Sequence, residues 1–105
     1  MAETVLGNYV KLVPGVPKRL RFKECKIVEK TVRDPKLGII LPKRAYVCIV
    51  TEEDGRPVNK LFSTLSEKLA IQLEQLRRAG ILYDRIIEIV WHPRDYATEY
   101  EVRVL

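Results

Sequence analysis

The chain has 105 residues, of which 47% are hydrophobic and 31% charged, and its formal net charge is +5. This length supports one hydrophobic core but not two, and this apolar content excludes a disordered chain. No apolar run approaches the roughly 18 residues of a membrane span, and the start of the chain lacks the basic and apolar regions of a signal peptide. We therefore expect a single domain over residues 1–105 in the cytoplasm. The many charges and few side-chain amides favour a thermophilic source.

The positive charge is concentrated in the first half of the chain. Residues 1–51 carry eleven Lys and Arg against four Asp and Glu, whereas residues 52–105 carry eight against ten. A basic half joined to a slightly acidic half predicts one positive face and an anionic partner. The alternative is a solvated surface that binds nothing.

The first predicted strands differ in length. Alternating side chains over residues 8–14 predict a short additional strand that ends at a Pro/Gly turn. Residues 18–32 form a long basic strand, in which the apolar positions shift from Leu20 and Phe22 to Cys25 and Ile27. Since neither Gly nor Pro interrupts this run, the shift predicts a β-bulge, which bends a long strand as a small barrel requires.

The middle of the chain predicts a hairpin that leads into a helix. After a connector over 33–43, a nearly continuous apolar run over 44–53 predicts a central strand. Asp54 and Gly55 supply the positive φ angles of a tight turn, and the chain returns over 56–64.

A helix is expected over about 65–79. Thr64 precedes Glu67 by three residues, which is the spacing of a capping box, and Gly80 marks the end. One face of this helix carries four leucines: Leu65, Leu69, Leu73 and Leu76. Two further strands are expected over 84–91 and 98–105.

These elements predict a mainly β protein with one helix, in the order β-β-β-α-β-β. That order is typical of a five-stranded antiparallel OB-like barrel with the helix between the third and fourth strands. A plain α+β sheet covered by one helix is the alternative.

The two cysteines fit neither a metal site nor a disulfide framework. We interpret Cys25 and Cys48 as reduced core residues. A mutual disulfide is the alternative, which two neighbouring strands would permit.

The long basic strand, the connector, the run AYVCIVTEEDGRPVNKLFSTLSEKLAIQL and the closing TEYEVRVL resemble the single-stranded nucleic-acid-binding OB proteins of archaea and their viruses. The resemblance covers about residues 17–105. It implies that single strands bind, with weak sequence preference, across a groove formed mainly by the second and third strands. We expect DNA rather than RNA.

Such a groove needs cations for phosphates and flat rings for bases. The candidates share solvent-facing positions on the first three strands or lie in the loop before the last strand: Arg19, Arg21, Lys23, Arg44, Tyr46, Lys60, Arg94 and Tyr96. For each cation, the alternative is an ordinary exposed surface charge. For Tyr46, the alternative is a ring in the core whose hydroxyl is hydrogen-bonded. Phe22 and Phe62 are expected in the core, and Trp91 either in the core or at the groove mouth.

Nothing in the sequence indicates catalysis. His92 is the one histidine, and no nucleophile elbow, phosphate-binding loop or dinucleotide-binding glycine pattern occurs. The acids Glu52, Glu53 and Asp54 predict a solvated turn that points away from a nucleic acid. We expect no catalytic residue, metal or cofactor.

The connector is unusually apolar for a loop. Its aliphatic residues predict contact with a second copy or a protein partner: Leu37, Ile39, Ile40 and Leu41. The alternative function is therefore a protein-interaction module or an oligomeric accessory subunit that binds no nucleic acid.

Overall fold

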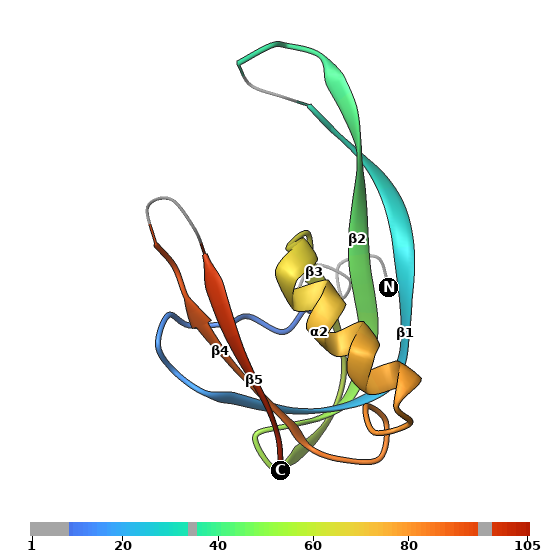
Figure 1. The fold of residues 1–105 in the computed structure, drawn as a ribbon, viewed down its shortest axis with the longest axis vertical. Helices are drawn as coiled ribbons and strands as arrows, with labels where there is room; N and C mark the ends of the chain where they lie inside the picture. Colours follow the sequence, from blue (N-terminus) through green and yellow to red (C-terminus); the bar gives the residue numbers. More distant parts are fainter. Residues whose placement is uncertain (1–8, 34–35, 95–97) are drawn as a thin grey trace.

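The computed structural model describes residues 9–33, 36–94 and 98–105 (Figure 1). The elements follow one another as β1 (Lys18–Arg33), β2 (Ile40–Glu53), β3 (Arg56–Thr64), α2 (Glu67–Arg78), β4 (Ile87–His92) and β5 (Glu99–Val104). The predicted order, with one helix between the third and fourth strands, is confirmed. No helix in the described part of the chain is long and apolar enough to cross a membrane.

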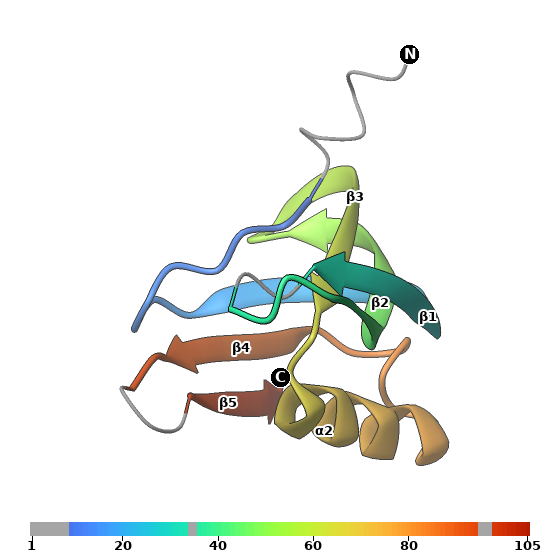
Figure 2. The same cartoon turned by 90° about the horizontal axis from the view of Figure 1, so that it is seen from above.

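The five strands form one antiparallel sheet in the order β3-β2-β1-β4-β5. Strands β3 and β5 are its two edges, so the sheet is not closed into a barrel in the described residues. Helix α2 runs beside the concave side of the twisted sheet (Figures 1 and 2).

The beginning of β1 lies between two neighbours. Leu20 pairs with Glu53 of β2 on one side and with Ile87 of β4 on the other. The register with β2 then shifts on both sides of Phe22, which confirms the predicted bulge. Because of this shift, Leu20 and Phe22 stay in the core and Cys25 comes to lie opposite Cys48.

Cys25 and Cys48 form a disulfide between β1 and β2, with their Cα atoms 4.0 Å apart. The expectation of two reduced cysteines is therefore wrong, and the alternative holds. The sequence could not decide this, because it does not set the register between β1 and β2 that places Cys25 opposite Cys48.

The hairpin between β2 and β3 turns at Asp54 and Gly55, whose φ angles are 50° and 85°. Both lie in the left-handed region that the sequence predicted for this turn. Glycine adopts such angles without steric cost.

Helix α2 begins at Glu67, two residues later than predicted. Its N-cap is Ser66, whose Oγ accepts a 3.3 Å hydrogen bond from the N–H of Leu69. Thr64 is still part of β3, where it pairs with Tyr46, so it cannot cap the helix, and Leu65 is 55% exposed. The sheet pairing outweighs the local capping signal.

The helix ends where the sequence predicted. Gly80 has a φ of 76°, its N–H donates to the carbonyl of Arg77, and Ile81 donates to that of Leu76. These bonds satisfy the last carbonyls of the helix. Leu69 and Leu73 are fully buried against the sheet.

The core joins the helix to four strands. Phe22 and Phe62 meet edge to face with ring centroids 6.1 Å apart, as expected for core rings. The other buried residues of this cluster are Val10, Leu20, Tyr46, Cys48, Val50, Leu69, Leu73, Leu82, Ile87 and Ile89.

The segment before β1 is not the strand predicted over 8–14. Its described residues make two isolated bridges, from Tyr9 to Leu61 of β3 and from Pro14 to Trp91 of β4. Val10 donates to the Leu61 carbonyl at 2.8 Å and is itself buried. The segment thus links β3 to β4 across the open side of the sheet (Figure 2).

Beyond Ile27 and Tyr46, the β1–β2 hairpin has no third strand among the described residues. We call residues 26–33 and 40–45 the arm; Lys26 and Ile27 form its base, where β3 still pairs with β2. It projects well past the rest of the sheet (Figure 1).

Candidate nucleic-acid interface

The structure places seven of the eight predicted site residues, and Tyr96 lies outside the described residues. The seven do not gather on one surface. They separate into cations that are paired with carboxylates, cations that are not, and one buried ring.

Three predicted cations on the strands are paired with acids of neighbouring strands. Arg19 Nε lies 3.2 Å from Glu88, and Lys60 Nζ lies 2.7 Å from Glu53. Arg21 Nε lies 3.8 Å from an oxygen of Glu52. A phosphate would have to compete with these carboxylates, which lowers the value of each cation as a nucleic-acid contact.

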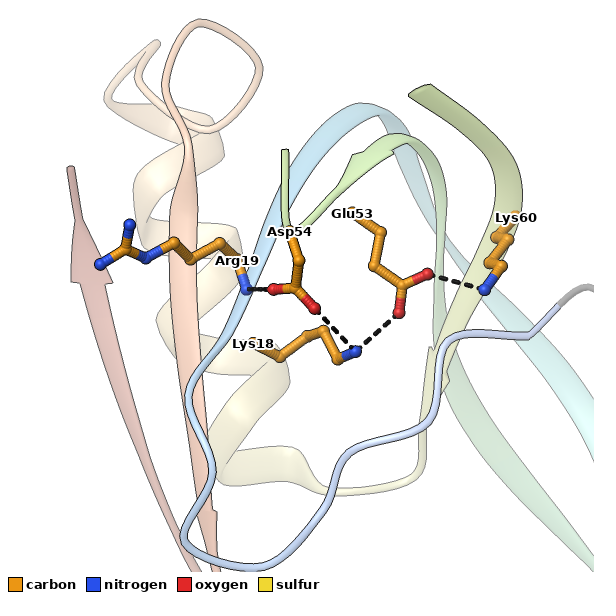
Figure 3. A network of polar contacts seen from close by, with 5 residues as sticks. All are labelled: Lys18, Arg19, Glu53, Asp54 and Lys60. Atoms are coloured by element: carbon orange, nitrogen blue, oxygen red, sulfur yellow. Dashed lines mark hydrogen bonds and ion pairs between the residues drawn. The ribbon is translucent and has the colours of Figure 1, made fainter. Parts of the chain in front are cut away.

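The pairing is densest around the turn between β2 and β3 (Figure 3). Glu53 bridges Lys18 and Lys60, with N–O distances of 2.8 and 2.7 Å. Asp54 accepts hydrogen bonds from the backbone N–H of Arg19 and from Lys18 Nζ. Glu53 and Asp54 therefore both attach the turn to the start of β1.

The ion pairs change the acidity of these groups. The hydrogen bonds from Lys18 and then Lys60 hold the pKa of Glu53 below its ordinary value, and the bond to Glu53 raises the pKa of Lys18. Burial acts to raise the pKa of Asp54, but the bonds from Arg19 and Lys18 leave it lowered. The turn is solvated at its tip, as predicted, since the Asp54 side chain is 48% exposed and Gly55 is exposed. The Glu53 side chain is only 12% exposed, and the ion-pair cluster that it forms was not predicted.

Tyr46 faces the core. Only 3% of the residue is exposed, and its hydroxyl donates a 2.8 Å hydrogen bond to Glu74 of α2. The alternative reading of this residue, a core ring with a bonded hydroxyl, describes the structure. The ring is thus not on the side of the sheet where Arg19 and Arg21 lie.

Near the β4–β5 connection the polar contacts are superficial. Arg94 lies 3.9 Å from Glu99, and both side chains are largely exposed. His92 contacts Glu101 at 3.0 Å. Trp91 is half-buried, and its Nε1 is enclosed without a hydrogen-bond partner among the described residues.

The two remaining predicted cations, Lys23 and Arg44, are exposed and make no ion pair with any described residue. The same holds for three arm residues that the sequence did not single out: Lys26, Arg33 and Lys43. The sequence could have pointed to these cations as candidate contacts, because all of them lie in its basic half. The sequence did not show which cations would be paired with acids, because those pairs depend on how neighbouring strands are aligned.

The β1–β2 register divides the arm into two faces. On what we call the inner face, Ile27, Glu29, Thr31 and Arg33 pair with Tyr46, Arg44, Pro42 and Ile40. Because side chains alternate along a strand, Lys26 and Lys43 lie on the opposite, outer face. The outer face continues into the half-buried residues Val47, Ile49, Leu61 and Ser63 of β2 and β3.

No family model matches the chain, and neither the curated proteins nor the solved structures compared with it include a match.

Proposed function

We propose that the protein binds single-stranded nucleic acid with weak sequence preference, through the exposed cations of the arm and its base. One observation carries this proposal: Lys43 is exposed on the projecting part of the arm, Lys23 and Lys26 are exposed near its base, and none of the three has a carboxylate partner among the described residues. Such cations can neutralise phosphates without first breaking an internal ion pair.

The physical driving force would be counterion release. Each phosphate neutralised by a lysine releases condensed cations from the strand, which favours binding at low salt irrespective of base sequence. A flexible single strand can follow a narrow ribbon more readily than a stiff duplex can. Since Tyr46 is buried, the contribution of stacking would be smaller than that of charge.

The proposal includes the OB-like architecture. OB-folds are five-stranded, partly open barrels that bind single strands on the face of strands two and three and on the adjoining loops. Five antiparallel strands with a helix after the third agree with that arrangement, and the segment 9–14 bridges β3 to β4. The arm would correspond to an extended loop between the first two strands.

The test is a titration of a labelled oligothymidine, followed by fluorescence anisotropy across a salt series. The K23A/K26A/K43A variant should bind more weakly and lower the slope of log affinity against log salt by about two units, at roughly 0.7 per lost contact on a single strand. A matched control, R19A/R21A/K60A, removes the same charge from cations that are already paired and should change the slope much less.

Two outcomes would overturn the proposal. One is a wild type that shows no salt-dependent binding to any single strand, and the other is an equal loss in both triple variants. An oligouridine and a duplex of the same length test the expected preference for single-stranded DNA.

A further inference from the structure

A pocket of about 190 Å³ lies between the end of β3, the end of β4 and the start of β5. The segment before β1 forms a further wall, so four separate parts of the chain build the pocket. Trp91 and Tyr100 are directly opposite each other in the β4–β5 ladder, and their side chains therefore share one face of the sheet. The lining includes Val10, Leu12, Phe62, Ser63, Trp91 and Tyr100.

The size of the pocket and its rings suit one flat ring system. Cavities that hold drug-sized ligands usually measure about 300–1,000 Å³, and this one is smaller. Ser63, Trp91 and Tyr100 are all half-buried, so each keeps part of its surface exposed. Aromatic side chains that line a pocket in this way offer flat faces on which another ring can stack.

Ser63 adds backbone groups that the sheet does not use. Val10 donates a 2.8 Å hydrogen bond to the carbonyl of Leu61, so the backbone of Leu61 is directed away from β2. Because backbone groups alternate in direction along an antiparallel strand, the N–H and C=O of Ser63, two residues on, are directed to the same edge. No described residue bonds to these two groups. The pocket is therefore bordered by one donor and one acceptor without a partner in the described part of the chain.

Nucleobases are the ligands that meet both features. Every base has a π-face that stacks on aromatic side chains, and each carries donors and acceptors along its edge. An aliphatic ligand would leave the backbone groups of Ser63 without partners. A sugar would bond to them but would not stack on the rings.

We propose that this pocket holds one nucleobase of the bound single strand. The base stacks on Trp91 or Tyr100, and its edge bonds to the backbone N–H and C=O of Ser63. The inference rests on the proposed function, and it adds a stacking site that the exposed cations of the arm do not provide.

Two exposed lysines lie near enough to take the neighbouring phosphates. Lys11 lies between two lining residues of the segment before β1, is exposed and makes no ion pair with any described residue. Its flexible four-carbon stem lets the ammonium reach a phosphate attached to the bound nucleoside. Lys26, Val47 and Ser63 form one cross-strand row, and two strand spacings place Lys26 about 10 Å from Ser63. A strand that contacts Lys26 can therefore place a nearby base in the pocket.

The experiment uses the fluorescence of Trp91, the only tryptophan of the chain. Thymidine, which carries no charge, should quench this fluorescence saturably at millimolar concentration and with little dependence on salt. Thymidine monophosphate should bind more tightly than thymidine at low salt, and K11A should remove that difference.

A pair of tyrosine variants tests the ring. Y100A should weaken thymidine binding by roughly tenfold, with unchanged circular dichroism. Y83A removes an exposed tyrosine that does not line the pocket, so it is the matched control and should bind thymidine as the wild type does. An equal loss in the two variants would contradict the proposal.

Nuclear magnetic resonance of the wild type locates the ligand without any substitution. On addition of thymidine, the amide signal of Ser63 and the indole signal of Trp91 should shift, whereas the amide signal of Lys43 in the arm should not. The absence of saturable quenching, or shifts confined to residues outside the pocket, would overturn the proposal.

The two proposals fail in different ways. An oligothymidine that binds with the salt dependence of the arm cations, but leaves the signals of Ser63 and Trp91 unchanged, would contradict the pocket alone. Thymidine binding in the pocket, without salt-dependent binding of any oligonucleotide, would contradict the proposed function and leave the pocket as a site for a free nucleoside.

Discussion

The hydroxyl of Tyr46 donates a 2.8 Å hydrogen bond to Glu74 and thereby connects the central strand β2 to helix α2. Arg77 donates to the same carboxylate, and these two bonds, the one from Arg77 first, lower the pKa of Glu74 to about 2. Burial and the bond to Glu74 raise the pKa of Tyr46, so the phenol stays protonated at physiological pH. The contact keeps the helix in place beside the base of the arm.

The Y46F variant should be less stable but should bind nucleic acid as the wild type does. Losing this hydrogen bond should lower the free energy of unfolding by about 1 kcal/mol, since the carboxylate retains its arginine partner. If the ring instead stacked on a base, Y46A would cost about 1–3 kcal/mol of binding. Urea denaturation of Y46F and oligothymidine titration of both variants measure these effects.

Acid should destabilise the protein through Glu74. Its folded-state pKa is depressed from 4.5 to about 2, so its stabilisation is present above about pH 4.5 and is lost as the pH falls through the folded value. The free energy of unfolding should therefore decrease between about pH 4.5 and pH 2. In E74Q that decrease should be shallower, and an identical pH profile for the two proteins would contradict the assignment.

Removing the N-cap should destabilise helix α2. Ser66→Ala deletes the hydroxyl that accepts from Leu69, and the loss should be about 1 kcal/mol. Gln75→Ala, at an exposed position of the same helix, is the control and should be close to neutral. Thermal and urea unfolding measure the stability of both variants. If the two variants are equally stable, Ser66 does not cap the helix.

The disulfide between β1 and β2 should stabilise the fold. It closes a loop between cysteines 23 positions apart, for which chain entropy gives about 3 kcal/mol. Reductant should therefore lower the urea concentration at which half of the wild-type protein is unfolded, by the shift that corresponds to this loss of free energy. The C25S/C48S variant should begin at the lower midpoint and should not respond to reductant; a midpoint that stays constant in both proteins would contradict this expectation.

The sequence predicted those features that depend on neighbouring residues. The bulge near Phe22, the turn at Asp54 and Gly55 and the helix end at Gly80 all follow from local patterns, and the structure contains each. Pairings across the sheet were not predictable in the same way. Lys18 meets Glu53 across 35 positions and Arg19 meets Glu88 across 69, so the sequence could not show which cations would be neutralised.

The same limit explains two further errors. Thr64 has the sequence of a helix cap, but pairing with Tyr46 keeps it in β3. Cys25 and Cys48 became partners because the bulge changed the register between two strands. In both cases tertiary pairing determined what local preference could not.

The pairing of β1 with β4 also has a kinetic consequence. The ladders between β1 and β2, β2 and β3, and β4 and β5 join neighbouring hairpin strands, but Leu20 and Ile87 meet only after most of the chain has been brought together. Closing so long a loop costs entropy before any contact compensates for it, and such contacts slow folding. We therefore expect Leu20→Ala to slow refolding in stopped-flow experiments if this contact forms in the transition state, whereas changes in the arm should mainly accelerate unfolding. The three-residue contact between β1 and β4 would then set how fast the whole domain folds.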